Sequence, residues 1–181
     1  AIRRIANQYG LVVIEDSADT LGAKINGSST GSYSDMSITS FYGSHIINCA
    51  GNGGALALNN TKVMEKAKLL RSWGRSSSLF DGESEDIKNR FNQKIDGFEY
   101  DSKFVFEEVG YNLEGSEIGA AFGLVQLKKL SENISTRKRN FQTLSDFFSQ
   151  YEKIFYKPEK TYGSESGWLA YPILISQHAP F

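Results

Sequence analysis

The stretch that decides the fold is Leu11-Val12-Val13-Ile14-Glu15-Asp16-Ser17-Ala18-Asp19. Its first four residues form a short apolar run, which is typical of a strand buried on both faces of a parallel sheet. The run ends abruptly in carboxylates, and the ligands of open α/β sheets bind at the carboxyl ends of the strands. The sequence therefore predicts a strand that delivers Asp16 and Asp19 to a ligand-binding edge.

Helical and strand-like segments alternate around this strand. Apolar residues recur at helical spacing over residues 2–9, and Gly10 suits the position just after a helix end. Further along, the patterns predict strands at 36–42, 55–58 and 171–175, a helix capped by Asn60 or Thr61, and a long helix over 116–151 with a break near 131–135. This order predicts an α/β fold of three layers, with helices on both faces of a mainly parallel sheet.

The composition argues against several kinds of partner and site. The 181 residues carry 20 Lys and Arg against 21 Asp and Glu, a balance that argues against nucleic acid as a partner. No stretch approaches the roughly 18 consecutive apolar residues that span a membrane, and no secretory signal is visible. The single cysteine excludes an internal disulfide and a cysteine-based zinc site. We expect a cytoplasmic protein without a membrane, nucleic-acid or metal partner.

Residues 75–105 differ from the rest because they are polar, mixed in charge and without clear periodicity. We expect a loop excursion here, with a short helix around 85–91 and a solvated acidic run at 81–86. The chain also begins without an initiator methionine and inside a predicted helix, so we expect flanking parts of the protein to be missing.

Four motifs follow one another along the chain: Glu15-Asp16-x-Ala18-Asp19-x-x-Gly22-Ala23, Ser40-Phe41-Tyr42-x-x-His45, Gly51-x-Gly53-Gly54-Ala55 and Gly110-Tyr111-Asn112-Leu113. In this order they resemble the DegT/DnrJ/EryC1/StrS family of sugar aminotransferases, which are pyridoxal phosphate enzymes with the aspartate aminotransferase fold. The resemblance implies that residues 1–150 are part of the cofactor-binding large domain, with the excursion at 75–105. It implies that residues 151–181 begin the small C-terminal domain and that the N-terminal part of the large domain is missing.

The resemblance also implies a role for five cofactor-binding residues. Asp16 would pair with the protonated pyridine nitrogen of the cofactor, and Ala18 would pack on the ring face. Ser40 would donate to the cofactor phosphate, and Asn112 would reach a phosphate from the neighbouring subunit of a homodimer. Asp19 would lie near the ring hydroxyl or near His45.

His45 stands where the family's aminotransferases carry the lysine that bonds covalently to the cofactor. Imidazole cannot form that bond, and a histidine at this position is similar to the family's 3-dehydratases, which remove the 3-hydroxyl of nucleotide-linked 4-keto-6-deoxyhexoses. Because histidine exchanges a proton near neutral pH, the resemblance implies a dehydratase, a lyase with His45 as its acid/base catalyst. It implies pyridoxal or pyridoxamine 5′-phosphate as cofactor and an amino donor such as glutamate. The deoxysugar would join a cell-surface polysaccharide, the more usual destination in the family, or a small secondary metabolite.

One branch of these dehydratases uses an iron–sulfur cluster, whose cysteines follow a segment like residues 70–75. Here Ser76, Ser77 and Ser78 occupy that place, and Cys49 is the single cysteine of the sequence. Such clusters are usually held by four cysteines, so we expect no iron–sulfur cluster in this span. Two alternatives stay open: a pyridoxal phosphate-dependent nucleotide-sugar aminotransferase, and an inactive fragment of such an enzyme.

Overall fold

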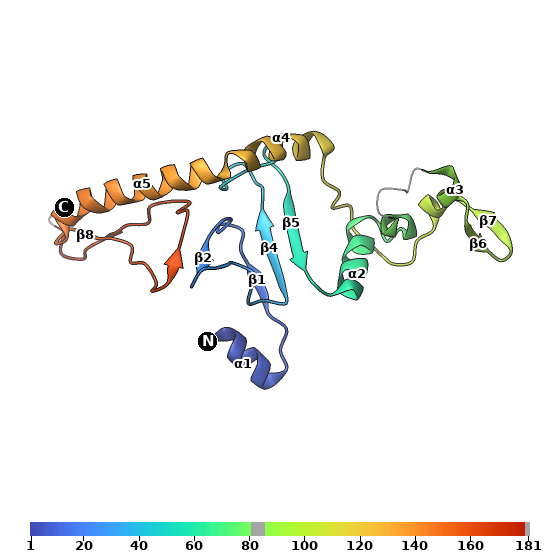
Figure 1. Cartoon of the computed structure of the whole chain (residues 1–181), viewed down its shortest axis with the longest axis horizontal. Helices are drawn as coiled ribbons and strands as arrows, with labels where there is room; N and C mark the ends of the chain where they lie inside the picture. The colour runs from blue at the N-terminus through green and yellow to red at the C-terminus, as the bar shows by residue number, and fades with distance from the viewer. Residues whose placement is uncertain (81–85, 180–181) are drawn as a thin grey trace. The chain divides into compact units, whose positions relative to one another are not determined.

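The computed structural model describes residues 1–80 and 86–179 (Figure 1). The chain divides into two compact units. Unit 1 combines Ala1–Ala57 with Ser116–Phe181, and unit 2 is Leu58–Gly115. The segment after residue 150 therefore packs with the first part of the chain.

The main sheet of unit 1 has the strand order β1-β4-β5. Its strands are β1 (Ile14–Asp16), β4 (Met36–Ser40) and β5 (Gly54–Leu58). β1 and β4 are parallel, with Asp16 opposite Ile38, whereas Figure 1 shows β5 running in the opposite direction to β4. The described sheet is thus mixed. A smaller antiparallel sheet has the order β3-β2-β9, from Ser28–Ser29, Lys24–Ile25 and Ser164–Glu165.

Helix α1 (Ile2–Tyr9) ends as its sequence predicts. Gly10 adopts a left-handed conformation with φ of 63°, and the Leu11 N–H donates to the Ala6 carbonyl at 2.8 Å. The strand expected at 11–14 begins later, because the Val13 N–H bonds the Asp35 carboxylate instead of a neighbouring strand. Regular pairing with β4 therefore starts only at Ile14.

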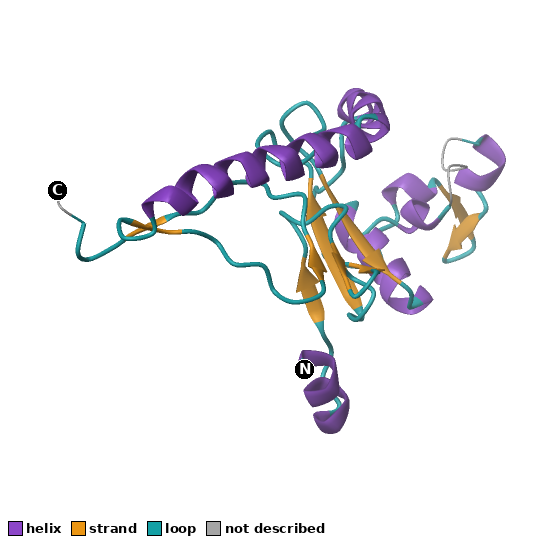
Figure 2. Cartoon of the chain, turned by 60° about the vertical axis from the view of Figure 1, so that its left-hand side comes forward, coloured by secondary structure: helices purple, strands orange, loops and turns teal. Residues whose placement is uncertain are grey.

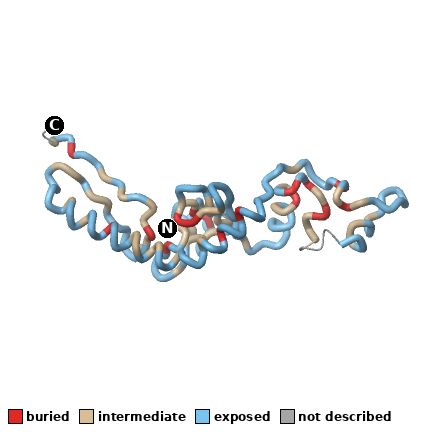
Figure 3. The backbone as a smooth tube through the Cα atoms, turned by 90° about the horizontal axis from the view of Figure 1, so that it is seen from above, coloured by how far each residue is buried: buried red, intermediate tan, exposed pale blue. Residues whose placement is uncertain are grey.

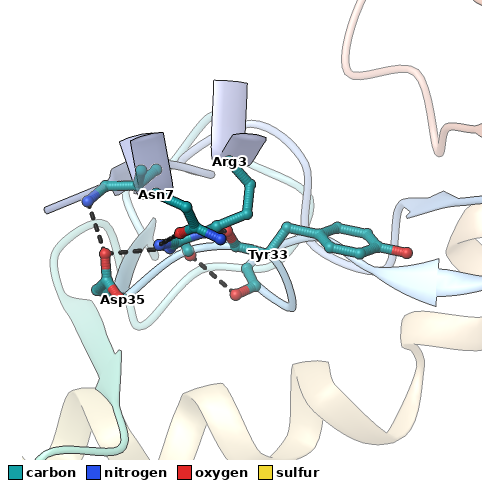
Figure 4. Close-up of polar contacts among 7 residues, drawn as sticks. Arg3, Asn7, Tyr33 and Asp35 are labelled. Carbon is teal, nitrogen blue, oxygen red and sulfur yellow. Dashed lines mark hydrogen bonds and ion pairs between the residues drawn. The ribbon is translucent and has the colours of Figure 1, made fainter. Parts of the chain in front are cut away.

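Arg3 ties α1 to the turn that precedes β4 (Figure 4). Its guanidinium donates to the Tyr33 carbonyl at 2.7 Å, to the Asp35 carboxylate at 3.0 Å and to Asn7 Oδ1 at 3.4 Å. The same Asp35 oxygen accepts the Val13 N–H at 2.7 Å. One carboxylate thus holds α1, the start of β1 and the start of β4 together.

The long helical segment is divided into α4 (Glu117–Lys128) and α5 (Leu130–Phe148). The expected break at 131–135 is wrong, since α5 runs through these residues and the two helices meet at Lys129. A 3₁₀ turn, η3 (Ser149–Tyr151), follows α5. The final strand is shorter than expected: β10 (Leu174–Ile175) pairs antiparallel with β8 (Phe155–Tyr156).

Unit 2 begins with α2 (Thr61–Arg71), which Asn60 caps by accepting the Val63 N–H. The excursion at 75–105 is more regular than expected and contains a hairpin. Its elements are η1 (Ser76–Leu79), α3 (Ile87–Arg90), β6 (Gln93–Ile95), β7 (Phe98–Tyr100) and η2 (Ser102–Phe104). The helix expected around 85–91 is present over Ile87–Arg90, whereas residues 81–85 of the acidic run lie outside the described residues.

Few of the described residues are buried (Figure 3). The buried apolar residues are Ala6, Ala23, Ile46, Ile47, Leu69, Val105 and Phe141. The expected burial of β1 on both faces is wrong for this chain, since Ile14 is 62% exposed and its neighbours Leu11 and Val12 are also exposed. The reason is that the described elements cover only part of the sheet. Within the described residues, no helix is both long and apolar enough to cross a membrane.

Candidate active site

Asp16 and Ser40 are the last residues of two parallel strands, β1 and β4, so they lie at the same edge of the sheet. Figures 1 and 2 both show α4 and the start of α5 at the end of the sheet where β4 ends. Asp16 is exposed, and its Oδ1 accepts the Ala18 N–H at 3.1 Å. Among the described residues, no other group donates to this carboxylate.

Glu15 fixes the turn that carries the next site residues, a role that the sequence analysis missed. Its Oε1 accepts the Ser17 hydroxyl at 2.6 Å and the Gly31 N–H at 2.8 Å. The Ser37 hydroxyl, on β4, donates to Ser17 Oγ at 3.2 Å, and Ser17 is buried. Since neighbouring strand residues point to opposite faces, Glu15 anchors the turn from one face while Asp16 is presented on the other. The signal in the sequence was this carboxylate placed inside the strand.

His45 and Asp19 come together from separate loops. Nδ1 of His45 lies 2.6 Å from Oδ1 of Asp19, and the His45 side chain is 17% exposed against 60% for Asp19. This oxygen lies away from the direction of an Nδ1–H bond, so the contact is a close approach of the two groups rather than a straight hydrogen bond. The Tyr42 ring approaches the imidazole edge-on, with 6.1 Å between ring centroids.

Helix α4 supports the loop that carries His45. A Cβ on Gly119 would lie 2.9 Å from the Cys49 carbonyl oxygen, and a Cβ on Gly123 would lie 2.5 Å from Cys49 Sγ. The two glycines are four residues apart and therefore share one face of the helix. Their lack of side chains lets α4 approach the loop, while Ile46 and Ile47 anchor it in the core.

Asn112 belongs to unit 2, whereas the other predicted site residues belong to unit 1. It is exposed and forms an isolated bridge with Ser72 within its own unit. Its expected contact with a phosphate stays a prediction.

The residues at the strand ends suit pyridoxal phosphate in their chemistry. Asp16 offers a carboxylate oxygen to a protonated ring nitrogen, and Ala18 offers a small, half-buried surface. Ser40 Oγ accepts the Tyr42 N–H at 3.2 Å, which leaves its hydroxyl proton available to a phosphate. Over residues 1–80 and 86–179, no cluster of three or more His, Cys, Asp and Glu residues could hold a metal ion.

A family comparison matches residues 1–180 to the DegT/DnrJ/EryC1/StrS aminotransferase family. A dTDP-4-dehydro-2,6-dideoxy-D-glucose 3-dehydratase of Saccharopolyspora spinosa is 32% identical over 99% of this chain and 39% of its own length. A UDP-4-amino-4,6-dideoxy-N-acetyl-beta-L-altrosamine transaminase of Campylobacter jejuni is 33% identical over 96% of this chain and 40% of its own length.

Among solved structures, the GDP-4-keto-6-deoxy-D-mannose-3-dehydratase of E. coli, with bound hydrated pyridoxal phosphate, matches with a TM-score of 0.79. It is 24% identical, and the match covers 99% of this chain and 44% of that structure. The likeness confirms the predicted α/β fold class of the pyridoxal phosphate-dependent transferases. The chain spans about 40% of the length of the relatives it matches.

Proposed function

The chain belongs to the DegT/DnrJ/EryC1/StrS aminotransferase family, and on that premise we propose that it is part of a pyridoxal phosphate-dependent 3-dehydratase of a nucleotide-linked 4-keto-6-deoxyhexose. The observation that carries the proposal is the imidazole of His45, held against the Asp19 carboxylate just beyond β4. The relative named a 3-dehydratase, 32% identical along nearly the whole chain, supports it. In this proposal residues 1–150 belong to the large domain and residues 151–181 begin the small one.

Four residues would hold the cofactor. Asp16 would pair with its ring nitrogen, Ala18 would lie against its ring, and Ser40 and Asn112 would bind phosphate. When bound in its pyridoxamine form, the cofactor supplies an amine for the sugar's keto group and a ring that accepts electrons. An amino donor such as glutamate would restore that form, and a second subunit would complete the site.

His45 would act as the acid/base catalyst, because its two nitrogens have different surroundings. The negative charge of the Asp19 carboxylate beside Nδ1 favours a proton on that nitrogen, although the contact is not a straight hydrogen bond. Nε2 is then the basic nitrogen, and among the described residues no group donates to it or accepts from it. His45 would take a proton at Nε2 and return it, while Asp19, which lies against Nδ1, is a positioning residue that orients the ring.

An aminotransferase is the second candidate, and the 33% identical Campylobacter jejuni transaminase favours it. That chemistry needs a lysine amine where His45 stands. The sequence has no lysine within five residues of His45, and the nearest lysines along the chain are Lys24 and Lys62. A third candidate, an inactive fragment, predicts no turnover.

Mass spectrometry of the sugar product separates these candidates. The purified protein is incubated with pyridoxal phosphate, glutamate and a nucleotide-linked 4-keto-6-deoxyhexose. The dehydratase releases ammonia and a sugar that lacks one oxygen atom, whereas the aminotransferase exchanges the keto oxygen for an amino group. An unchanged sugar or an aminated product contradicts the proposal. His178→Asn is the matched control for a substitution of His45, because His178 is the other histidine of the sequence and lies exposed outside the site.

A further inference from the structure

A cavity in unit 1, apart from the strand ends, has a volume of about 270 Å³. It lies between α5 and the segment that follows residue 159, and its lining includes Lys138, Lys160, Glu165, Ser166 and Trp168. We propose that this cavity binds a phosphate group of a small ligand. The proposal is independent of the cofactor chemistry at His45.

The charge of the lining favours an anion. Lys138 Nζ lies 3.3 Å from Glu165 Oε2, so this lysine and this carboxylate of the lining balance each other. Lys160 is the second lysine of the lining, and within the described chain its ammonium contacts no carboxylate and instead lies 5.4 Å from the centre of the Phe141 ring. The lining therefore keeps a net positive charge that an anion would neutralise.

The aromatic wall of the cavity is held in a strained conformation. Trp168 has a φ of 47°, which is rare for a bulky residue. Its backbone N–H donates to Ser166 Oγ at 3.0 Å, and its backbone carbonyl accepts from the Arg137 guanidinium at 3.3 Å. Its ring stacks on Phe141, with 3.8 Å between centroids. Strain that the surroundings hold so firmly is a feature of ligand sites, and it gives a wall that is in place before any ligand binds.

The available donors suit phosphate better than a carboxylate. Lys138 and Lys160 supply ammonium protons, and the Ser166 hydroxyl, which already accepts the Trp168 N–H, keeps its own proton to donate. Three donating groups match the three free oxygens of a phosphate ester, whereas a carboxylate offers two. The phosphate could come from a nucleotide or from inorganic phosphate species, which share this chemistry.

Tryptophan fluorescence tests the proposal. In the Trp73→Phe variant, Trp168 is the one remaining tryptophan, since the sequence has two. Titration of this protein with sodium pyrophosphate at constant ionic strength should change the Trp168 emission in a saturable way. Lys160→Met should weaken pyrophosphate binding about fivefold or more, because a charge-assisted contact is lost. Lys157→Met, a lysine that pairs with Glu152 outside the cavity, should leave binding unchanged.

A titration with UDP identifies the source of the phosphate, and further lysine variants control for unfolding. Tighter binding of UDP than of pyrophosphate would assign the site to a nucleotide, and equal binding would assign it to the phosphate group alone. Lys160→Arg should retain binding, and Lys138→Met serves as a second variant if circular dichroism shows Lys160→Met to be unfolded. The proposal is overturned if pyrophosphate gives no saturable change, if glutamate binds equally well, or if the lysine variants in the cavity behave like Lys157→Met.

Discussion

Oδ1 of Asp19 lies 2.6 Å from Nδ1 of His45. The two residues are separated by 26 positions, and each lies in the loop that follows one strand of the parallel β1–β4 pair. The parallel pairing brings both loops to one edge of the sheet, which is why the contact can form. The proposed acid/base chemistry depends on this contact.

Replacing Asp19 with asparagine should slow the reaction without weakening substrate binding. The neutral amide no longer places a negative charge against Nδ1 to orient the imidazole, so kcat should fall about tenfold to a hundredfold while KM stays nearly unchanged. Steady-state kinetics of the whole protein measure both parameters. Asp19→Glu keeps the negative charge and should recover part of kcat; an equal loss in both variants would argue for a merely structural residue.

Adding a methyl group at Gly123 should destabilise unit 1. The Cβ of Gly123→Ala would lie 2.5 Å from Cys49 Sγ, so that the helix or the loop must shift. We expect a loss of about 1–3 kcal/mol in the free energy of unfolding, measured by urea denaturation. Cys49→Ala removes the sulfur, and the double variant should regain most of the loss. A double variant as unstable as Gly123→Ala would show that the clash lies elsewhere.

Asp35 should make the stability of the fold depend on acid pH. The hydrogen bond from the Val13 N–H, and then that from Arg3, lower the pKa of the Asp35 carboxyl below its ordinary value of 3.8. A lowered pKa in the folded state stabilises the fold above pH 3.8, and this contribution is lost as the pH falls through the folded pKa.

The measurement is thermal unfolding from neutral pH downwards. Asp35→Asn should remove this part of the acid destabilisation, and Arg3→Gln should remove only a portion, because the stronger Val13 hydrogen bond remains. If the unfolding temperature falls equally at acid pH in Asp35→Asn and in the unchanged protein, the assigned contact is contradicted.

Local chemistry made much of the fold predictable. Gly10 ends α1 with a left-handed residue, and Asn60 caps α2 through its side chain, as their residue types suggest. Strand lengths were less predictable, because they depend on partners distant in sequence. The Val13 N–H is taken by Asp35, which shortens β1, and the partner of β10 precedes it at Phe155–Tyr156. The helix break at Lys129 was likewise not predictable, because no glycine or proline stands beside it in the sequence.

The candidate site was predictable where a residue sits at a strand end, as Asp16 and Ser40 do. The contacts that hold the site residues in place were not predictable, because they are tertiary contacts. The bonds of Glu15 to Ser17 and Gly31, and the approach of α4 to Cys49, join segments whose spacing carries no periodic signal. The cavity near Trp168 depends in the same way on the clamp from Arg137, 31 residues away along the chain.

The proposed function depends on an imidazole in place of the amine that would otherwise bind the cofactor covalently. The most direct measurement is borohydride reduction of the protein with pyridoxal phosphate, followed by peptide mass spectrometry. We predict no reduced lysine adduct in the unchanged protein, and a new adduct at position 45 in His45→Lys, together with loss of deoxygenation. A lysine adduct in the unchanged protein, or a His45→Lys variant that still removes the 3-hydroxyl, would contradict the account.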